Sequence, residues 1–147
     1  LEVSSVMMTW EGRPAQLSFM RDITEKKAAE EALRRSERLR KDIINFLPDA
    51  TFAIDRQGRV TAWNRAMEAL TGVASKDMIG KGDGEYSLAF YGERKPILID
   101  MALHPSLPMT GRFLSFHQGD DFLLAEKEFV QNGQTIILWC KAGAMNG

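Results

Sequence analysis

Apolar and polar residues alternate at the start of the chain, which is the pattern of β-strands with two different faces. The alternation runs through residues 3–9, stops at the turn-forming sequence Glu11-Gly12-Arg13-Pro14, and resumes over residues 15–21. Gly and Pro between two alternating runs favour a tight connection. The pattern therefore predicts a β-hairpin over residues 1–23.

A long helix is predicted next, because residues 25–46 are rich in Glu, Lys, Arg, Ala and Leu and contain no Gly or Pro. Asp22 and Glu25 have the spacing of a capping box, and Pro48 ends the helix. Small and apolar residues follow one another at spacings of three and four, as in a coiled-coil seam: Ala29, Ala32, Ser36, Leu39, Ile43 and Phe46.

The helix has two interpretations. It is either a single solvated helix packed on its own domain or one helix of a coiled coil formed with a second chain. An isolated polar helix of this length is marginal in water, which favours pairing with a second chain. We therefore take Leu39, Ile43 and Phe46 as the candidates for a dimer seam.

The rest of the chain alternates between short strands and short helices. Two strands, 51–55 and 60–63, flank the turn Arg56-Gln57-Gly58-Arg59. Later, Asn132-Gly133 joins two further strands, 122–131 and 134–142, with a strong hairpin signal. Between them the sequence predicts a helix at 65–70, with Asn64 as its N-cap and Gly72 just beyond its end. It also predicts helices at 75–79 and 95–103, the last with Pro96 in its first turn, a glycine-rich loop at 81–85, and irregular structure at 104–121.

Composition and charge exclude several classes of function. The chain has 147 residues, which suits one domain with an appendage, and a formal net charge of −1, so no basic excess points to nucleic acid. The single cysteine, Cys140, cannot form an internal disulfide and fits a reducing compartment, so we expect a cytoplasmic location. The apolar runs are too short for membrane insertion. We expect the chain to be a piece of a longer protein.

Five segments in one order resemble the opening half of a PAS domain: Leu47-Pro48-Asp49-Ala50, Ile54-Asp55-Arg56-Gln57-Gly58-Arg59-Val60, Trp63-Asn64-Arg65-Ala66, Leu70-Thr71-Gly72 and Ile79-Gly80-Lys81. The segment Phe90-Tyr91-Gly92-Glu93-Arg94-Lys95-Pro96-Ile97 resembles one common in PAS domains of bacterial and archaeal sensor kinases. The segment Asp22-Ile23-Thr24-Glu25-Lys26-Lys27 resembles the end of a PAS domain.

This resemblance implies an α+β fold, with an antiparallel sheet and short helices on one face, preceded by a β-hairpin and a long linker helix. It divides the chain into the trailing hairpin of a preceding repeat (1–24), a linker or coiled-coil helix (25–46) and a PAS domain (47–147). PAS domains have five strands, and the sequence supplies four, so we expect the last strand to be missing. The Ala15–Arg21 strand would then complete the open edge, either within one chain or exchanged between the chains of a dimer. The length of the linker helix favours exchange.

The function that the resemblance implies is sensory. The module would bind a small ligand, or relay a signal through its dimeric linker helix, to an output domain such as the histidine kinase of a two-component system. The ligand-pocket candidates are apolar residues on the expected inner faces: Phe52, Ile54, Met67, Phe90, Ile97, Leu98, Met101, Phe129 and Trp139. A second hypothesis is a pure dimerisation module without a ligand, and a third is a haem or flavin redox sensor.

The residues identify no cofactor and speak against haem and flavin. Haem needs an axial ligand, but His104 sits where it would cap a helix and His117 lies in a polar loop. The reactive cysteine of light-sensing flavin domains has no counterpart, because Cys140 reads as an apolar filler on a strand. A non-covalent flavin would need an aromatic wall, for which Trp63, Trp139 and Phe129 are available.

No catalytic chemistry is indicated either. The sequence contains no metal-ligand spacing, and Gly80-Lys81-Gly82-Asp83-Gly84 lacks the ending of a phosphate-binding loop. Two histidines do not assemble into a nucleophile, base and acid set. We therefore expect a regulatory fragment that is not an enzyme and has no metal site.

Overall fold

The chain is described by a computed structural model, which covers residues 1–108 and 112–145. Its elements are short helices and antiparallel strands, and they fall into two units, Leu1–Ile43 and Ile44–Gly147. Among the described helices, none combines the length and the apolar composition that crossing a bilayer requires.

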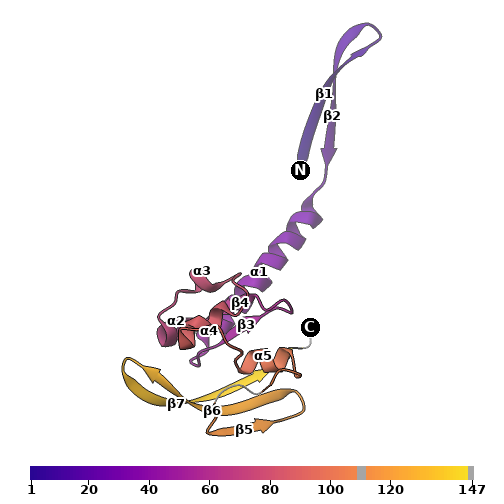
Figure 1. Ribbon diagram of the computed structural model, residues 1–147. Coiled ribbons are helices and arrows are strands. Elements are labelled where there is room, and N and C mark those ends of the chain that lie inside the picture. The colour runs from indigo at the N-terminus through magenta and orange to yellow at the C-terminus, as the bar shows by residue number, and fades with distance from the viewer. Residues whose placement is uncertain (109–111, 146–147) are drawn as a thin grey trace. The chain divides into compact units, whose positions relative to one another are not determined.

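The first unit opens with a hairpin formed by β1 (Glu2–Trp10) and β2 (Arg13–Arg21) (Figure 1). The pairing runs without a shift from Glu2 opposite Arg21 to Trp10 opposite Arg13. The connection consists of Glu11 and Gly12, with φ values of 49° and 76°. Positive φ at both positions is the two-residue turn that matches strand twist, so the predicted hairpin is present, with a tighter turn than expected.

Helix α1 spans Thr24–Phe46. The Asp22 carboxylate accepts hydrogen bonds from the Thr24 backbone N–H (2.9 Å) and hydroxyl (2.6 Å) and so satisfies donors at the start of the helix. The same bonds lower the pKa of Asp22 below its ordinary value. No residue of α1 is buried.

The second unit begins with β3 (Phe52–Ile54) and β4 (Val60–Trp63), which pair as a two-stranded sheet. The Asp55 carboxylate accepts hydrogen bonds from the backbone N–H groups of Gln57 and Arg59, both at 2.9 Å, and holds the predicted turn. Strand β3 is shorter than predicted, because Asp55 already belongs to the turn. Val60, the first residue of β4, donates its N–H to the Lys81 carbonyl, and its own carbonyl accepts the Gly80 N–H.

Four short helices follow: α2 (Arg65–Thr71), α3 (Ser75–Met78), α4 (Glu85–Tyr91) and α5 (Leu98–Leu103). Asn64 caps α2 and Gly72 ends it at φ 74°, as the sequence predicted. Helix α4 was not predicted.

Helix α5 was predicted to begin at Lys95, which is wrong. Ile97 is extended, with φ −121° and ψ −178°, and the Asp100 carboxylate accepts the Ile97 N–H at 2.8 Å. This cap sets the start of the helix at Leu98, beyond Pro96, so the proline does not occupy the first turn.

The last three strands, β5 (Ser115–Gln118), β6 (Phe122–Gln131) and β7 (Gln134–Gly143), form a second sheet in the order β5-β6-β7. The Asn132-Gly133 hairpin is present, with φ 51° and 77°. Strand β5 lies in a stretch predicted to be irregular, so the count of four strands, on which the missing strand rested, was wrong. Hydrogen bonds join the five strands into two sheets, where one was predicted.

Candidate functional site

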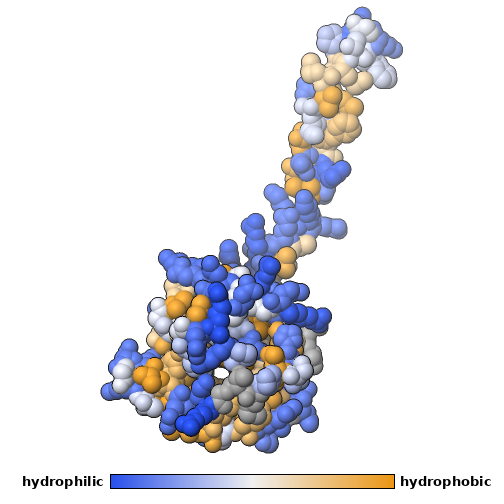
Figure 2. All heavy atoms as spheres, in the orientation of Figure 1, coloured by the Kyte–Doolittle hydropathy of each residue, from blue (hydrophilic) through white to orange (hydrophobic). Residues whose placement is uncertain are grey.

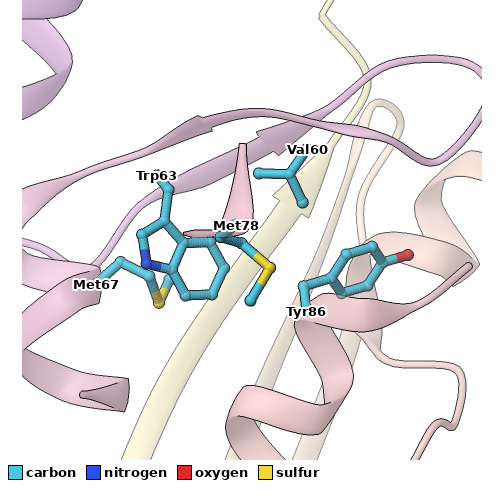
Figure 3. Close-up of a cluster of buried hydrophobic side chains, with 5 residues drawn as sticks. All are labelled: Val60, Trp63, Met67, Met78 and Tyr86. Atoms are coloured by element: carbon cyan, nitrogen blue, oxygen red, sulfur yellow. The ribbon is translucent and has the colours of Figure 1, made fainter. Parts of the chain in front are cut away.

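The core of the second unit is a closed cluster of side chains from β4, α2, α3 and α4 (Figure 3). Its buried members are Val60, Trp63, Met67, Met78 and Tyr86. Phe52 lies with its ring centroid 5.5 Å from those of both Trp63 and Tyr86, within the range of favourable aromatic contacts. The Trp63 indole N–H donates to the Val73 carbonyl at 3.0 Å, so its polar edge is also satisfied.

Most of the predicted pocket residues meet in or beside this cluster. Met67 is buried in it, and Phe52, Ile54, Phe90 and Ile97 pack against it. Phe129 reaches the same region from β6, with its ring centroid 6.1 Å from that of Phe90. These side chains are brought together as packed core, because they contact one another in and around a single cluster. Neither of the two cavities described below has any of them in its lining.

The remaining candidates lie elsewhere. Leu98 is buried in a second cluster, where α5 packs on β6 and β7 through Ala125 and Ala142. Met101 is buried on the same helix. Trp139 is 64% exposed and lies opposite Glu126, on the face of the sheet away from α5, so the structure does not bring it to the other candidates.

Helices α4 and α5 are linked by a pair that the sequence did not single out, the buried Tyr86 and the half-buried Asp100. The Tyr86 hydroxyl donates to one oxygen of Asp100, whose other oxygen accepts the Ile97 N–H. Burial raises the pKa of Tyr86 above its ordinary value, and the hydrogen bond to Asp100 and the charge of that carboxylate raise it further. In Figure 3 the hydroxyl points away from the apolar side chains, toward the edge of the cluster. The signal available in the sequence was the three-residue spacing of Ile97 and Asp100, which lets the carboxylate cap the start of α5.

Asn64 connects the core to the end of α1. It is fully buried, and its side-chain oxygen accepts the N–H groups of Thr51 and Met67, both at 2.9 Å. Its side-chain nitrogen donates to the Asp49 carbonyl at 2.9 Å and to the Ile44 carbonyl at 3.2 Å. One side chain therefore ties the start of α2 to the last turn of α1 and to the segment that enters β3.

A cavity of about 280 Å³ lies between the end of α5 and the β5–β6 turn. Met101 is the one predicted pocket residue in its lining. Apolar side chains and the carboxylates of Asp120 and Asp121 surround it: Met101, Ala102, Pro105, Leu107, Phe116, Gln118, Gly119, Asp120, Asp121, Phe122, Leu123 and Ala144. Its size is near the lower limit of small-molecule sites.

A second cavity, of about 270 Å³, lies beside the start of α4. Charged side chains line it, and those of Arg94 and Lys95 are already paired, with Glu85 at 2.6 Å and Glu93 at 2.8 Å. The pairing with Lys95 lowers the pKa of Glu93. A ligand at this position would have to compete with these ion pairs.

The described residues offer little for redox or metal chemistry. They contain no group of three His, Cys, Asp or Glu side chains placed to hold a metal ion. Cys140 is half-buried on β7, and burial raises the pKa of its thiol, which makes it a poor nucleophile. Every buried side-chain nitrogen or oxygen in the described part of the chain has a hydrogen-bond partner.

The dimer-seam candidates Leu39, Ile43 and Phe46 are all exposed on α1. A second helix packed along α1 would cover their apolar side chains.

The search of curated proteins gave no match. A family model described as the PAS fold matches residues 38–82, a range that runs from the second half of α1 through β3, β4, α2 and α3. It includes the five segments that resemble the opening half of a PAS domain, from Leu47 to Lys81, while the segments 22–27 and 90–97 lie outside it. The helices and antiparallel strands of the second unit are consistent with that fold. The PAS fold is thus detected by similarity at residues 38–82, which suggests a sensory or regulatory role.

Proposed function

We propose that this chain is a sensory or regulatory module of a signalling protein and that it acts as a homodimer through α1. The observation that supports this most is the extent of the PAS match, which begins at residue 38 and so includes the seam residues Leu39, Ile43 and Phe46. The sensory unit and the exposed seam are thus parts of one continuous segment. In a longer protein, the output would be an adjoining domain such as a histidine kinase.

Asn64 supplies a physical route between the two parts. A shift of β4 or α2 would move its side chain, which holds the Ile44 and Asp49 carbonyls. Breaking these bonds would leave buried polar groups unpaired, so the end of α1 should follow the core rather than separate from it. A small change in the sensory unit would then shift the population between two arrangements of the paired helices.

The dimer is tested by introducing a charge into the seam. Replacing Ile43 with Asp places a carboxylate where we propose buried apolar contact, which should cost about 2 kcal/mol or more and shift sedimentation from dimer to monomer. Lys41→Asp is the matched control, because it adds the same residue to the same helix two positions away, outside the seam. A dimer that resists Ile43→Asp, or that dissociates equally with Lys41→Asp, would contradict the proposal.

A pure assembly module remains the second candidate, favoured by the close packing of the predicted pocket residues. The two hypotheses differ in whether a small molecule is retained. Native mass spectrometry of the purified dimer would reveal a bound mass if the module senses a ligand, and the cavity lined by Met101 is where we would place it. A visible absorbance band would instead favour a haem or flavin sensor.

A further inference from the structure

The cavity at the end of α5 has walls that differ from most of the surface of its unit. On the face drawn in Figure 2, hydrophilic side chains cover most of the second unit and hydrophobic ones form smaller patches. The cavity is lined mainly by apolar side chains, among them the buried Met101 and the half-buried Phe116 and Leu123. A cavity of about 150 Å³ can hold benzene, so its volume of about 280 Å³ suffices for one ring with a short substituent.

The charged part of the lining is acidic. Asp120 and Asp121 lie in the turn between β5 and β6, where the Gly119 N–H donates to the Phe122 carbonyl at 2.9 Å. Both carboxylates are exposed, and neither forms an ion pair with a residue that the structure describes. Lys141 contacts the Phe122 ring, with its Nζ 4.8 Å from the ring centroid, but it is not among the lining residues. The described lining thus offers two carboxylates and no cationic side chain to balance them.

A backbone acceptor at the end of α5 adds to this acidic character. In an α-helix each carbonyl accepts the N–H of the residue four positions later. For Met101 that residue is Pro105, which has no N–H, and no other described backbone N–H donates to the Met101 carbonyl. Met101 and Pro105 both line the cavity, so this acceptor lies beside it. Carbonyls left over at a helix end are satisfied by water or by a donor on a ligand.

We propose that this cavity binds a small organic cation, in which one ammonium group is attached to a compact apolar body. The proposal rests on the proposed sensory function and names the class of ligand for the same cavity. The body would lie against Met101, Phe116 and Leu123, where it loses contact with water. The ammonium group would lie near Asp120 and Asp121, and its several N–H donors also suit the Met101 carbonyl.

The lining is less suited to other ligand classes. An anion would meet two carboxylates without a balancing cation, which is unfavourable. A bare metal ion would gain nothing from the apolar walls, and the described residues contain no group of three acidic, His or Cys side chains placed to hold one. A neutral molecule would fill the same space but would leave the charge of Asp120 and Asp121 unused.

Three probes of similar shape test the charge of the ligand on the intact chain: benzylammonium, benzyl alcohol and benzoate. Titrations followed by the NMR signals of backbone amides at 119–123 should show benzylammonium binding about threefold to tenfold more tightly than benzyl alcohol, because the carboxylates are exposed and their attraction is modest. Benzoate should bind most weakly, and added salt should narrow the differences. Equal affinities for benzylammonium and benzyl alcohol would overturn the proposed class. Absence of saturable binding by all three probes would overturn the site.

A double variant tests the two carboxylates. Asp120→Asn combined with Asp121→Asn removes both charges, while Asn keeps the size of the side chains and suits a turn. This protein should bind benzylammonium and benzyl alcohol about equally. Asp83→Asn is the matched control, because Asp83 lines the second cavity instead, and it should keep the preference of the wild type. A preference that persists in the double variant, or that is lost in Asp83→Asn, would contradict the role of these carboxylates.

Filling the cavity tests the location. Met101→Trp places a larger side chain where the ring of the probe would lie, and it should weaken the binding of all three probes at least about tenfold. Thermal unfolding checks that the variant is folded, and Ala102→Leu, at a half-buried position of the same lining, replaces it if it is not. Unchanged binding in the folded variant would mean that the probes bind elsewhere, and would overturn the proposal.

Sedimentation of the same protein separates this inference from the proposed function. If the chain is a dimer that Ile43→Asp dissociates, but no probe binds, the ligand class and the site fail and the proposed dimer stands. If the chain is a monomer that prefers benzylammonium to benzyl alcohol, the proposed dimer fails and the cation site stands.

Discussion

The two long hairpins of this chain, β1–β2 and β6–β7, are built alike and differ in what lies against them. Each has strands of nine or ten residues in an unbroken register, joined by a two-residue turn. The turns Glu11-Gly12 and Asn132-Gly133 have almost the same backbone angles, with φ 49° and 76° against 51° and 77°. Local chemistry therefore accounts for both hairpins equally well.

The two hairpins differ in how far their residues are buried. In β6–β7, Ala125 and Ala142 are buried beneath α5, with Leu98 as their contact. In β1–β2 no residue is buried. Alternation and a good turn thus suffice to define a hairpin, but a third element must cover one face before the hairpin gains a core. The difference is that α5 covers one face of β6–β7, while no element of the first unit covers either face of β1–β2.

The largest effect is expected when one tryptophan in each region is replaced by alanine. The replacement in the second unit should lower its unfolding free energy, and the replacement in the uncovered hairpin should not. Trp63 is 3% exposed and Trp10 is 65% exposed. Trp63→Ala should lower the free energy of unfolding of the second unit by about 3–5 kcal/mol, because it leaves a cavity in the core. Trp10→Ala should change it by less than about 0.5 kcal/mol. Urea unfolding followed by circular dichroism measures both, and a comparable loss in Trp10→Ala would mean that the hairpin shares the core.

A smaller effect concerns Tyr86, which belongs to the covered unit, while the hairpin contains no tyrosine. Replacing Tyr86 with Phe removes the hydrogen bond to the Asp100 carboxylate and should cost about 1.5–3 kcal/mol near neutral pH.

The pH dependence has a definite sign. The folded protein holds the Tyr86 proton more tightly than the unfolded chain, in which the group titrates near its ordinary pKa of 10.0. The stability that it contributes is complete below that pH and is lost as the pH rises above it. Wild type should therefore lose stability more steeply than Tyr86→Phe in alkaline urea titrations. Parallel curves for the two proteins would be evidence against a buried, protonated Tyr86.

The sequence predicted what depends on local chemistry. Both hairpins, the Asn64 cap and the Gly72 end of α2 follow from residues within a few positions of one another. Strand β5 was missed because Ser115–Gln118 shows no clear alternation and becomes a strand only by pairing with β6. Helix α4 was missed although left-handed glycines, Gly84 and Gly92, bound it at both ends.

The site was harder to predict, because it depends on which face of an element is covered. Trp139 lies on a correctly predicted strand, but α5 covers the opposite face, and a change of one position in the alternation exchanges the two faces. The Tyr86–Asp100 pair joins residues 14 apart on two helices whose packing no local pattern specifies. Asn64 was predicted as a cap, but its bonds to Ile44 and Asp49 depend on the path of the chain between α1 and β3.

The smallest effect should come from the two turn glycines. It tests whether turns of similar geometry contribute equally to the unfolding free energy of the second unit. Gly12 and Gly133 both have positive φ, and an added Cβ would meet no atom within 4 Å at either position. Alanine therefore introduces only the backbone strain of a left-handed residue, about 1 kcal/mol. Gly133→Ala should lower the unfolding free energy of the second unit by that amount, since the β6–β7 turn opens only when the unit unfolds. Gly12→Ala should leave that free energy unchanged and instead speed hydrogen exchange of the β1–β2 amides, because this hairpin opens on its own. Asn at position 133 is the control, since it tolerates positive φ better than Ala and should cost less. If Gly12→Ala and Gly133→Ala lowered the unfolding free energy of the second unit equally, the two hairpins would unfold together. They would then differ only in how exposed their residues are to solvent.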